Sequence, residues 1–331
     1  MIELKHDRLT VSFPDLHPKA RMTLAFQRTL RVPDDNQDYP LPAGLGTFPL
    51  LSVNHCEVPP HWRGRGGVLL PMYQSEAMWI NLTAGNDGYP MAVKIAAGKI
   101  NAVTGQPWSN ELSAALQDYV VIPTQPWLDG FSVSRSIVRQ FVAAPLYSGL
   151  TAEEQMTGEG RWGGIQMIFY PMKAEVYRRR FERPPPKASV DRHAANFDDL
   201  DDDIGVLGLA PGGRIRQEIA ADPFGISDWE ANVSSRCFIH LLNSKSYEAV
   251  TGQAPPESPV TPEEYARAGI PWFDYYHDGK ILKGSQNLAA LDGLGTALMK
   301  KGDKLDDNRP VYIQKTFKLS KNKSIIEDGD F

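Results

Sequence analysis

The sequence predicts a mainly β protein, an antiparallel sandwich or barrel, with several short helices mostly in the C-terminal third. Apolar and aromatic segments of strand length recur between residues 66 and 127, each bounded by Gly, Pro or Asn. The 26 prolines and 28 glycines indicate many tight turns. Helix start and stop signals are strongest after residue 225. Short strands joined by turns therefore form most of the expected fold.

Strand signals begin near the N-terminus. Leu9–Phe13 and Met22–Val32 are joined by a turn at residues 15–18, and the apolar residues of the second strand alternate onto one face. The later strands are short apolar runs between turn residues. They cover Val68–Tyr73, Met91–Ala97, Tyr119–Ile122, Ile137–Ala143, Ile165–Tyr170, the buried segment SSRCFIHLLN and an imperfect edge strand within Arg309–Lys318.

Helix signals are local and specific. The stretch TAEE from residue 151 is a capping box, with a glycine at 158 to end the helix. The stretch TPEE from residue 261 adds a proline at the first helical position. Ser244 begins a helix that ends at Gly252. Two weaker helix patterns cover Ser109–Gln117 and Asn287–Leu298, of which the second contains two glycines.

The length of 331 residues fits one large domain or two ordinary ones. Composition changes abruptly near residue 173, where a basic cluster around three consecutive prolines precedes an acidic run at 198–203. Such segments do not pack a core. The pattern predicts a β-rich domain at 1–183, a Pro-rich and acidic linker or extended loop at 184–203, and a mixed α/β region at 204–331 packed on the first.

Charge and cysteine content narrow the class of protein. A net charge of −5 argues against a general nucleic-acid binder, which needs a basic face. No apolar window reaches the roughly 18 residues of a membrane span, and the N-terminus lacks a signal-peptide pattern. Two cysteines exclude a disulfide framework. The expected location is cytoplasmic. The opposite charge blocks can pair within one chain or between chains, and between chains they favour oriented association with a second copy or with another protein.

Cysteine and histidine spacing suggests a metal site. His55, Cys56 and His61, together with Cys237 and His240, offer enough sulfur and imidazole ligands for tetrahedral zinc. The competing interpretation is packing, because Cys237 and His240 lie three apart in an apparent strand and so point to opposite faces. Free cysteine is also commonly buried without a role. Zinc is the only cofactor that the sequence suggests.

Catalytic candidates are few. Cys237 and His240 form a nucleophile–base pair if their segment is helical. Carboxylates among apolar residues are a second group, because such surroundings raise a carboxyl pKa and suit acid–base chemistry. Hydrogen-bonded structural roles compete with that interpretation. The group contains Glu76, Asp118, Asp129 and Asp274, the last beside aromatic residues and His277.

Five segments carry a resemblance to a known group of sequences. They are GGVLLPMYQSEAMWINL, AVKIAAGKINAVTGQPW, DYVVIPTQPWLDGF, GGIQMIFYPMK and PVTPEEYARAGIPWFDYY. Across most of the chain, from about Tyr39 to Tyr276, these segments resemble an uncharacterised family of microbial hypothetical proteins. The resemblance implies no activity and assigns no site residue.

Two classes of function follow from the sequence. The first is a non-catalytic structural or interaction protein, with self-assembly as one form. The second is a hydrolase-like enzyme or a binder of small, sugar-like molecules that uses the aromatic–carboxylate clusters. A closed pocket lined by Glu76 or Asp274 would favour the second class, and a large native mass would favour the first.

Overall fold

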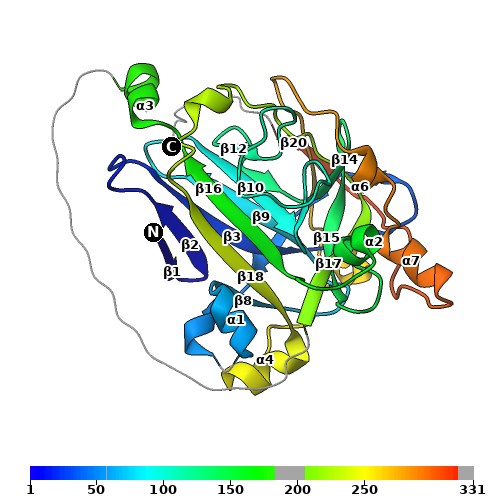
Figure 1. Cartoon of the computed structure of the whole chain (residues 1–331). Coiled ribbons are helices and arrows are strands. Elements are labelled where there is room, and N and C mark those ends of the chain that lie inside the picture. Colours follow the sequence, from blue (N-terminus) through cyan, green and yellow to red (C-terminus); the bar gives the residue numbers. More distant parts are fainter. Residues whose placement is uncertain (57, 183–205, 320–331) are drawn as a thin grey trace, which may run out of the picture.

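The computed structural model describes residues 1–56, 58–182 and 206–319, and it confirms the predicted fold class (Figure 1). The strands of the main sheet are β1 (Ile2–Lys5), β2 (Arg8–Ser12), β3 (Arg21–Thr29), β4 (Asp38–Tyr39), β6 (Gly44–Thr47), β7 (Leu51–Ser52), β8 (Val68–Met72), β9 (Ala77–Ala84), β10 (Met91–Ala97), β11 (Ile100–Asn101), β12 (Val120–Ile122), β13 (Trp127–Leu128), β14 (Gly130–Ser134), β15 (Ile137–Pro145), β16 (Ile165–Pro171), β17 (Val206–Arg216) and β18 (Ser235–Asn243). A second sheet contains β5 (Leu41–Pro42), β19 (Trp272–Tyr275) and β20 (Thr316–Leu319). The described helices are α1 (Pro60–Arg65), α2 (Ala152–Thr157), α3 (Ala174–Phe181), α4 (Ser244–Thr251), α5 (Pro262–Arg267), α6 (Gln286–Ala289) and α7 (Leu294–Lys300).

The main sheet is a continuous series of antiparallel neighbours. They run in the order β9, β15, β17, β18, β16, β10 and β12. The chain then passes from β12 to β13, which pairs with β9 on the same edge as β15. On the other side of β9, strands β3, β2 and β1 extend the sheet as antiparallel neighbours. Parallel pairing in the main sheet is limited to β17 with β4 and β18 with β8.

The central strands are buried along their whole length. All seven residues of β10 and all seven of β16 are buried, so both faces of these strands are covered. Their sequences, MAVKIAA and IQMIFYP, are therefore apolar apart from Lys94 and Gln166 and do not alternate strictly. One large apolar cluster connects these strands with side chains from β2, β3, β9 and β15.

Short helices cover the sheet at its ends and side. α2 and α7 pack on β17, α6 packs on β14, and α4 contacts β8 and β18. In Figure 1, α1 and α4 lie together at one end of the molecule, and α2, α6 and α7 lie along the side formed by β14, β15 and β17. Four of the described helices follow residue 243, as the sequence predicts.

Local capping signals are confirmed. The capping boxes at Thr151 and Thr261 are both formed, and they start α2 and α5. Two helix predictions are wrong. Residues 109–117 form an irregular loop with bends, and the single helix expected over Asn287–Leu298 is divided into α6 and α7.

Segments from both predicted domains share the main sheet. β17 and β18 come from the range 204–331, and they lie between β15 and β16, which come from the range 1–183. The predicted linker at 184–203 lies outside the described residues. Among the described helices, none combines the length and the apolar character that crossing a bilayer requires.

Candidate functional site

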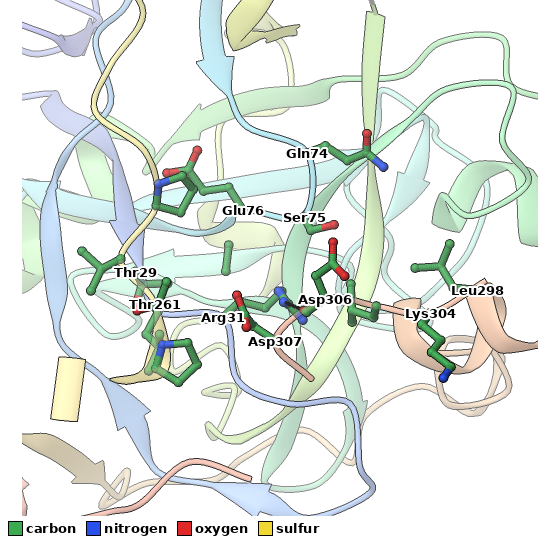
Figure 2. A pocket seen from close by; sticks show the side chains of 16 residues that line it. Thr29, Arg31, Gln74, Ser75, Glu76, Thr261, Leu298, Lys304, Asp306 and Asp307 are labelled. Atoms are coloured by element: carbon green, nitrogen blue, oxygen red, sulfur yellow. Dashed lines mark hydrogen bonds between the residues drawn. The ribbon is translucent and has the colours of Figure 1, made fainter. Parts of the chain in front are cut away.

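A cavity of about 490 Å³ opens where β3 ends, and we call it the Arg31 cleft. It includes Glu76, one of the residues that the sequence singled out. Figure 2 shows Arg31 beside Asp306 and Asp307, with Ser75 and Glu76 on another wall. The lining consists of residues 29–31, 74–77, 259–262, Leu298 and 304–307.

A tight turn between β8 and β9 places Glu76 in the wall of the cleft. Ser75 has a φ of 65°, a left-handed conformation that is uncommon for a residue other than glycine. The turn is held because Ser75 N–H donates to the carbonyl of Ala143 and Glu76 N–H donates to the carbonyl of Tyr73, at 2.8 and 3.1 Å. This conformation directs the Glu76 side chain inward, where it is 3% exposed.

The Glu76 carboxylate is occupied by partners within the protein. Its Oε1 accepts from Arg28 Nε at 2.6 Å and lies 2.5 Å from Arg28 Nη2, while Oε2 accepts from Tyr73 N–H at 2.9 Å. Burial raises the pKa of this carboxyl, and the Tyr73 N–H and the Arg28 guanidinium oppose that rise. Glu76 therefore orders Arg28 and the turn at the cleft, and Arg28 already neutralises its charge.

Arg31 has an unsatisfied hydrogen-bond donor in the cleft. Its Nη2 donates to the backbone carbonyl of Asp306 at 2.5 Å. Its Nη1 is buried and has no hydrogen-bond acceptor among the described residues. Burial lowers the pKa of this guanidinium, and the carboxylates of Asp307, Asp306 and Asp34 oppose the shift. Such an orphaned cationic nitrogen is costly unless a further group completes its bonding.

The wall formed by residues 304–307 is tied to the strand end through Asp34. Asp34 Oδ2 accepts from the backbone N–H of Thr296 in the first turn of α7, and Oδ1 accepts from Arg139 Nη1. Asn308 Oδ1 accepts from Asp34 N–H at 2.8 Å. A side chain at Gly293 would place its Cβ 2.2 Å from the Asp34 carboxylate, so only glycine allows this approach. The segment 293–308 is therefore fixed across the end of β3.

Asp274 and His277 lie outside the lining of this cleft. Asp274, on β19, pairs with Arg216, whose Nε and Nη2 lie 3.0 and 2.9 Å from Oδ1. His277 follows β19, and its N–H donates to Glu218 Oε2 at 2.7 Å. The structure therefore does not bring Glu76 and Asp274 into one pocket, and each has its own arginine.

The cysteines and histidines of the predicted metal site lie in different surroundings. Cys237 packs in the large core, while Cys56 packs with Trp62 in a smaller cluster. Both thiols are free and buried, and burial raises the pKa of Cys237 to about 12 and that of Cys56 to about 11. His55 lies in a short 3-10 turn at Val53–His55 and His61 is exposed on α1.

His240 stacks between aromatic rings. Its ring centroid is 4.4 Å from that of Trp62 and 4.4 Å from that of Phe238. Its Nε2 is 3.0 Å from the carbonyl oxygen of Gly66, and burial lowers the His240 pKa to about 3. A neutral imidazole that donates to Gly66 fits this geometry. Phe238 and His240 share a face of β18, so Cys237 lies on the other face, as strand alternation requires.

Metal ligation has no preformed cluster in the part of the chain that the structure describes. No three His, Cys, Asp or Glu side chains gather there in a way that could hold an ion. The zinc interpretation of the sequence stays a prediction, which metal analysis of the purified protein tests.

Sequence reasoning missed Arg31, Lys304, Asp306 and Asp307. The available signal was Arg31 itself, a charged residue between two fully apolar neighbours at a strand end, Leu30 and Val32, which are 1% and 0% exposed. The residues at 304–307 reach the cleft only through the contacts of α7 with a distant strand, which no local pattern encodes.

Comparison of the chain with protein-family models, with curated proteins and with solved structures found no match. The function is therefore argued from the geometry of the described residues.

Proposed function

We propose that this protein binds a small polar molecule that carries a carboxylate or phosphate group, and that the acid group of this molecule lies against Arg31. The buried Arg31 Nη1 without an acceptor is the observation that carries the proposal. A cavity of about 490 Å³ falls within the size range of small-molecule sites. An oxyanion would complete the bonding of the guanidinium with charge-assisted hydrogen bonds.

The rest of the lining favours a ligand with more than one kind of polar group. Lys304 adds a second cation, and the exposed carboxylates of Asp306 and Asp307 suit hydroxyl or amino groups. None of the described residues that line the cleft is aromatic, so they offer no stacking surface of the kind that many sugar sites use. Because Arg28 already pairs with Glu76, we propose binding rather than acid–base catalysis at this position.

Calorimetric titration with acetate, malate, aspartate and glycerol 3-phosphate tests the proposal. These compounds differ in acid group and in their hydroxyl or amino groups. Arg31→Gln should weaken the affinity for the compound that binds most tightly at least about tenfold, because a hydrogen bond to a charged group contributes about 1.5–3 kcal/mol. Arg135→Gln, at an exposed arginine outside the cleft, is the matched control.

Lys304→Gln provides a second variant that leaves the fold intact, since Lys304 is exposed. Lys304→Gln should weaken the binding of the same compound by a smaller factor than Arg31→Gln does. The proposal fails if no compound in the panel binds, or if binding is the same in wild type, Arg31→Gln and Arg135→Gln.

A second candidate function is self-assembly, and one surface favours it. The last described strand, β20, pairs only with β19 within residues 1–56, 58–182 and 206–319. Tyr312, Phe317 and Leu319 are 75%, 41% and 42% exposed. Exposed apolar side chains at an open strand edge suit pairing with a second copy. Light scattering decides: a discrete oligomer supports this function, and a 36.8 kDa monomer at every concentration rules it out.

The cytoplasmic location belongs to the same set of proposals. It is supported by the two cysteines, which are both free thiols in the structure.

A further inference from the structure

A row of alternating rings and cations crosses one side of the sheet, and we call it the cation–aromatic row. The Arg65 guanidinium lies 5.2 Å from the ring of Phe238 and 4.8 Å from that of Trp162. The Lys99 ammonium follows, 5.1 Å from Trp162 and 5.2 Å from Trp108. At the Phe238 end, the row continues into the stacked ring of His240.

The cations of this row lie against aromatic rings, and the Glu153 carboxylate attracts Arg65 without forming an ion pair with it. Within the described part of the chain, Arg65, Lys99 and Arg161 form no ion pair with Asp or Glu. A ring face attracts a cation without neutralising it. The row therefore keeps a net positive field, and the pKa of Lys99 is lowered by burial and then by Arg236 and Arg65.

Lys99 is held in place by an unusual turn. Gly98 and Lys99 are the two central residues of the hairpin that joins β10 to β11, with φ values of 56° and 65°. Two positive φ values are typical of a type I′ turn, where Asn and Gly are the preferred residues. The backbone of Lys99 is also fixed by its N–H, which donates to Gln166 Oε1 at 2.6 Å. A lysine here is a poor choice for the turn alone, which indicates that its side chain is required.

A cavity of about 440 Å³ lies directly at Lys99, and Trp108, Arg161 and Trp162 also line it. Two carboxylates belong to the lining. Glu153 is 3% exposed and accepts from the backbone N–H groups of residues 161, 162 and 163 at 2.9, 2.8 and 2.8 Å, which hold its carboxylate in place. Glu159 is exposed at the rim.

We propose that the cavity at Lys99 is a second binding site, separate from the Arg31 cleft, that takes a phosphate group. The lysine ammonium supplies a point charge and the guanidinium of Arg161 supplies a planar pair of donors, and both suit a multiply charged oxyanion. The two indole rings limit the access of water to the ammonium, which strengthens its attraction for an anion. The phosphate is either the free ion or part of a small phosphate ester.

Tryptophan fluorescence provides the readout, because two indoles line the cavity. The intact protein is titrated at low ionic strength with inorganic phosphate and, separately, with glycerol 2-phosphate, while sodium chloride at equal ionic strength serves as the salt control. We expect a saturable change with at least one phosphate compound and none with chloride. Tighter binding of the ester identifies a phosphate ester as the ligand class, and tighter binding of the free ion identifies phosphate itself.

Lys99→Asn is the decisive variant, because asparagine is favoured at this left-handed position and removes only the charge and the side-chain length. It should weaken phosphate binding at least tenfold while leaving the melting temperature unchanged or higher. Arg161→Gln, at an exposed residue, should also weaken binding. Lys280→Asn, at an exposed lysine outside the cavity, is the control and should leave phosphate binding unchanged.

Three results would overturn the proposal: no saturable binding of either compound, wild-type binding by Lys99→Asn, or equal losses in Lys99→Asn and Lys280→Asn. Arg31→Gln should leave this binding unchanged, because the two cavities share no lining residue. Failure at one site is thereby distinguished from failure at the other.

Discussion

The carboxyl of Asp129 is buried, and no Lys, Arg or His of the described residues forms an ion pair with it. Its Oδ2 accepts from Gln217 Nε2 at 2.6 Å, and burial raises its pKa to about 7. Because the folded-state pKa exceeds the ordinary value of 3.8, the folded protein binds an extra proton between about pH 4 and 7. Stability contributed by this group is therefore fully present below pH 4 and lost as the pH rises to 7.

We predict that Asp129→Asn raises the free energy of unfolding at pH 8 by up to roughly 4 kcal/mol, from about three pKa units at about 1.4 kcal/mol each. The gain should shrink towards zero near pH 4, where wild-type Asp129 is protonated. Urea unfolding at pH 5, 6, 7 and 8 measures the difference. A constant difference between the two proteins across this range would contradict the prediction.

The stability that His240 contributes changes with pH in the opposite direction. Its pKa is lowered from 6.5 to about 3 because the stacked ring is buried. The unfolded chain takes up the proton first, so stability from this group is present above pH 6.5 and lost as the pH falls towards 3. Between about pH 4 and 6.5 the changes at Asp129 and His240 therefore nearly cancel in the wild type.

We predict that His240→Phe removes this acid-side loss. Phenylalanine keeps the stacking on Trp62 and Phe238 and forfeits the hydrogen bond to Gly66, a cost of about 1 kcal/mol that does not vary with pH. The variant should gain stability relative to wild type as the pH is lowered from 7 to 5, by up to about 1.4 kcal/mol for each pH unit below 6.5. Urea unfolding of both proteins at pH 5, 6 and 7 tests the prediction. It is refuted if the free energy of unfolding changes with pH in the same way in His240→Phe and in the wild type.

At the scale of elements, Lys94 explains why residues 109–117 do not form the predicted helix. Lys94 is 1% exposed on β10, and its Nζ lies 2.6 Å from Asp118 Oδ2 and donates to Ser109 Oγ at 2.8 Å and to the carbonyl of Glu111 at 2.5 Å. Asp118 Oδ1 also accepts from the N–H of Ser113 at 3.0 Å. The buried Lys94 ammonium needs hydrogen-bond acceptors, and the loop supplies them from the Glu111 carbonyl and the side chains of Ser109 and Asp118. This requirement outweighs the weak helix propensity of the loop.

We predict that Lys94→Met destabilises the protein by about 3–5 kcal/mol, because it leaves the Asp118 carboxylate buried without its cation. Adding Asp118→Asn should recover part of the loss, since asparagine removes the charge and keeps an acceptor for Ser113. Chemical denaturation of the wild type, the two single variants and the double variant gives the double-mutant cycle that measures this coupling. A double variant that is less stable than Lys94→Met would show that the buried charge is not the cause.

Local patterns predicted the elements whose causes are local. Met91–Ala97 matches β10 because proline and glycine bound an apolar run, and the capping boxes start α2 and α5 as expected. The break between α6 and α7 has a distant cause, since Asp34 approaches Gly293 and holds the first turn of α7. The residues of the Arg31 cleft show the same difference between local and distant causes. Glu76 was identified from its apolar surroundings, whereas its partner Arg28 comes from a strand 48 residues earlier.

At the scale of the whole molecule, the order of strands determines how the chain divides. The order of neighbours in the main sheet is β15, β17, β18 and β16, so two strands from the range 204–331 separate two strands from the range 1–183. A fragment of residues 1–183 would leave β15 and β16 without the neighbours that complete their hydrogen bonds. Open edges of this length are unfavourable and prone to aggregation.

We therefore predict that neither 1–183 nor 204–331 folds alone, and that the two fragments, produced together, assemble into a complex that unfolds cooperatively. The reason is that the large apolar cluster contains residues from both ranges, with Ile165 and Met167 of β16 paired with Ile239 and Cys237 of β18. Circular dichroism in a urea gradient on each fragment and on the pair is the measurement, with the intact chain as the control. Cooperative unfolding of 1–183 by itself would establish it as an independent domain and show that β17 and β18 are additions to a complete core.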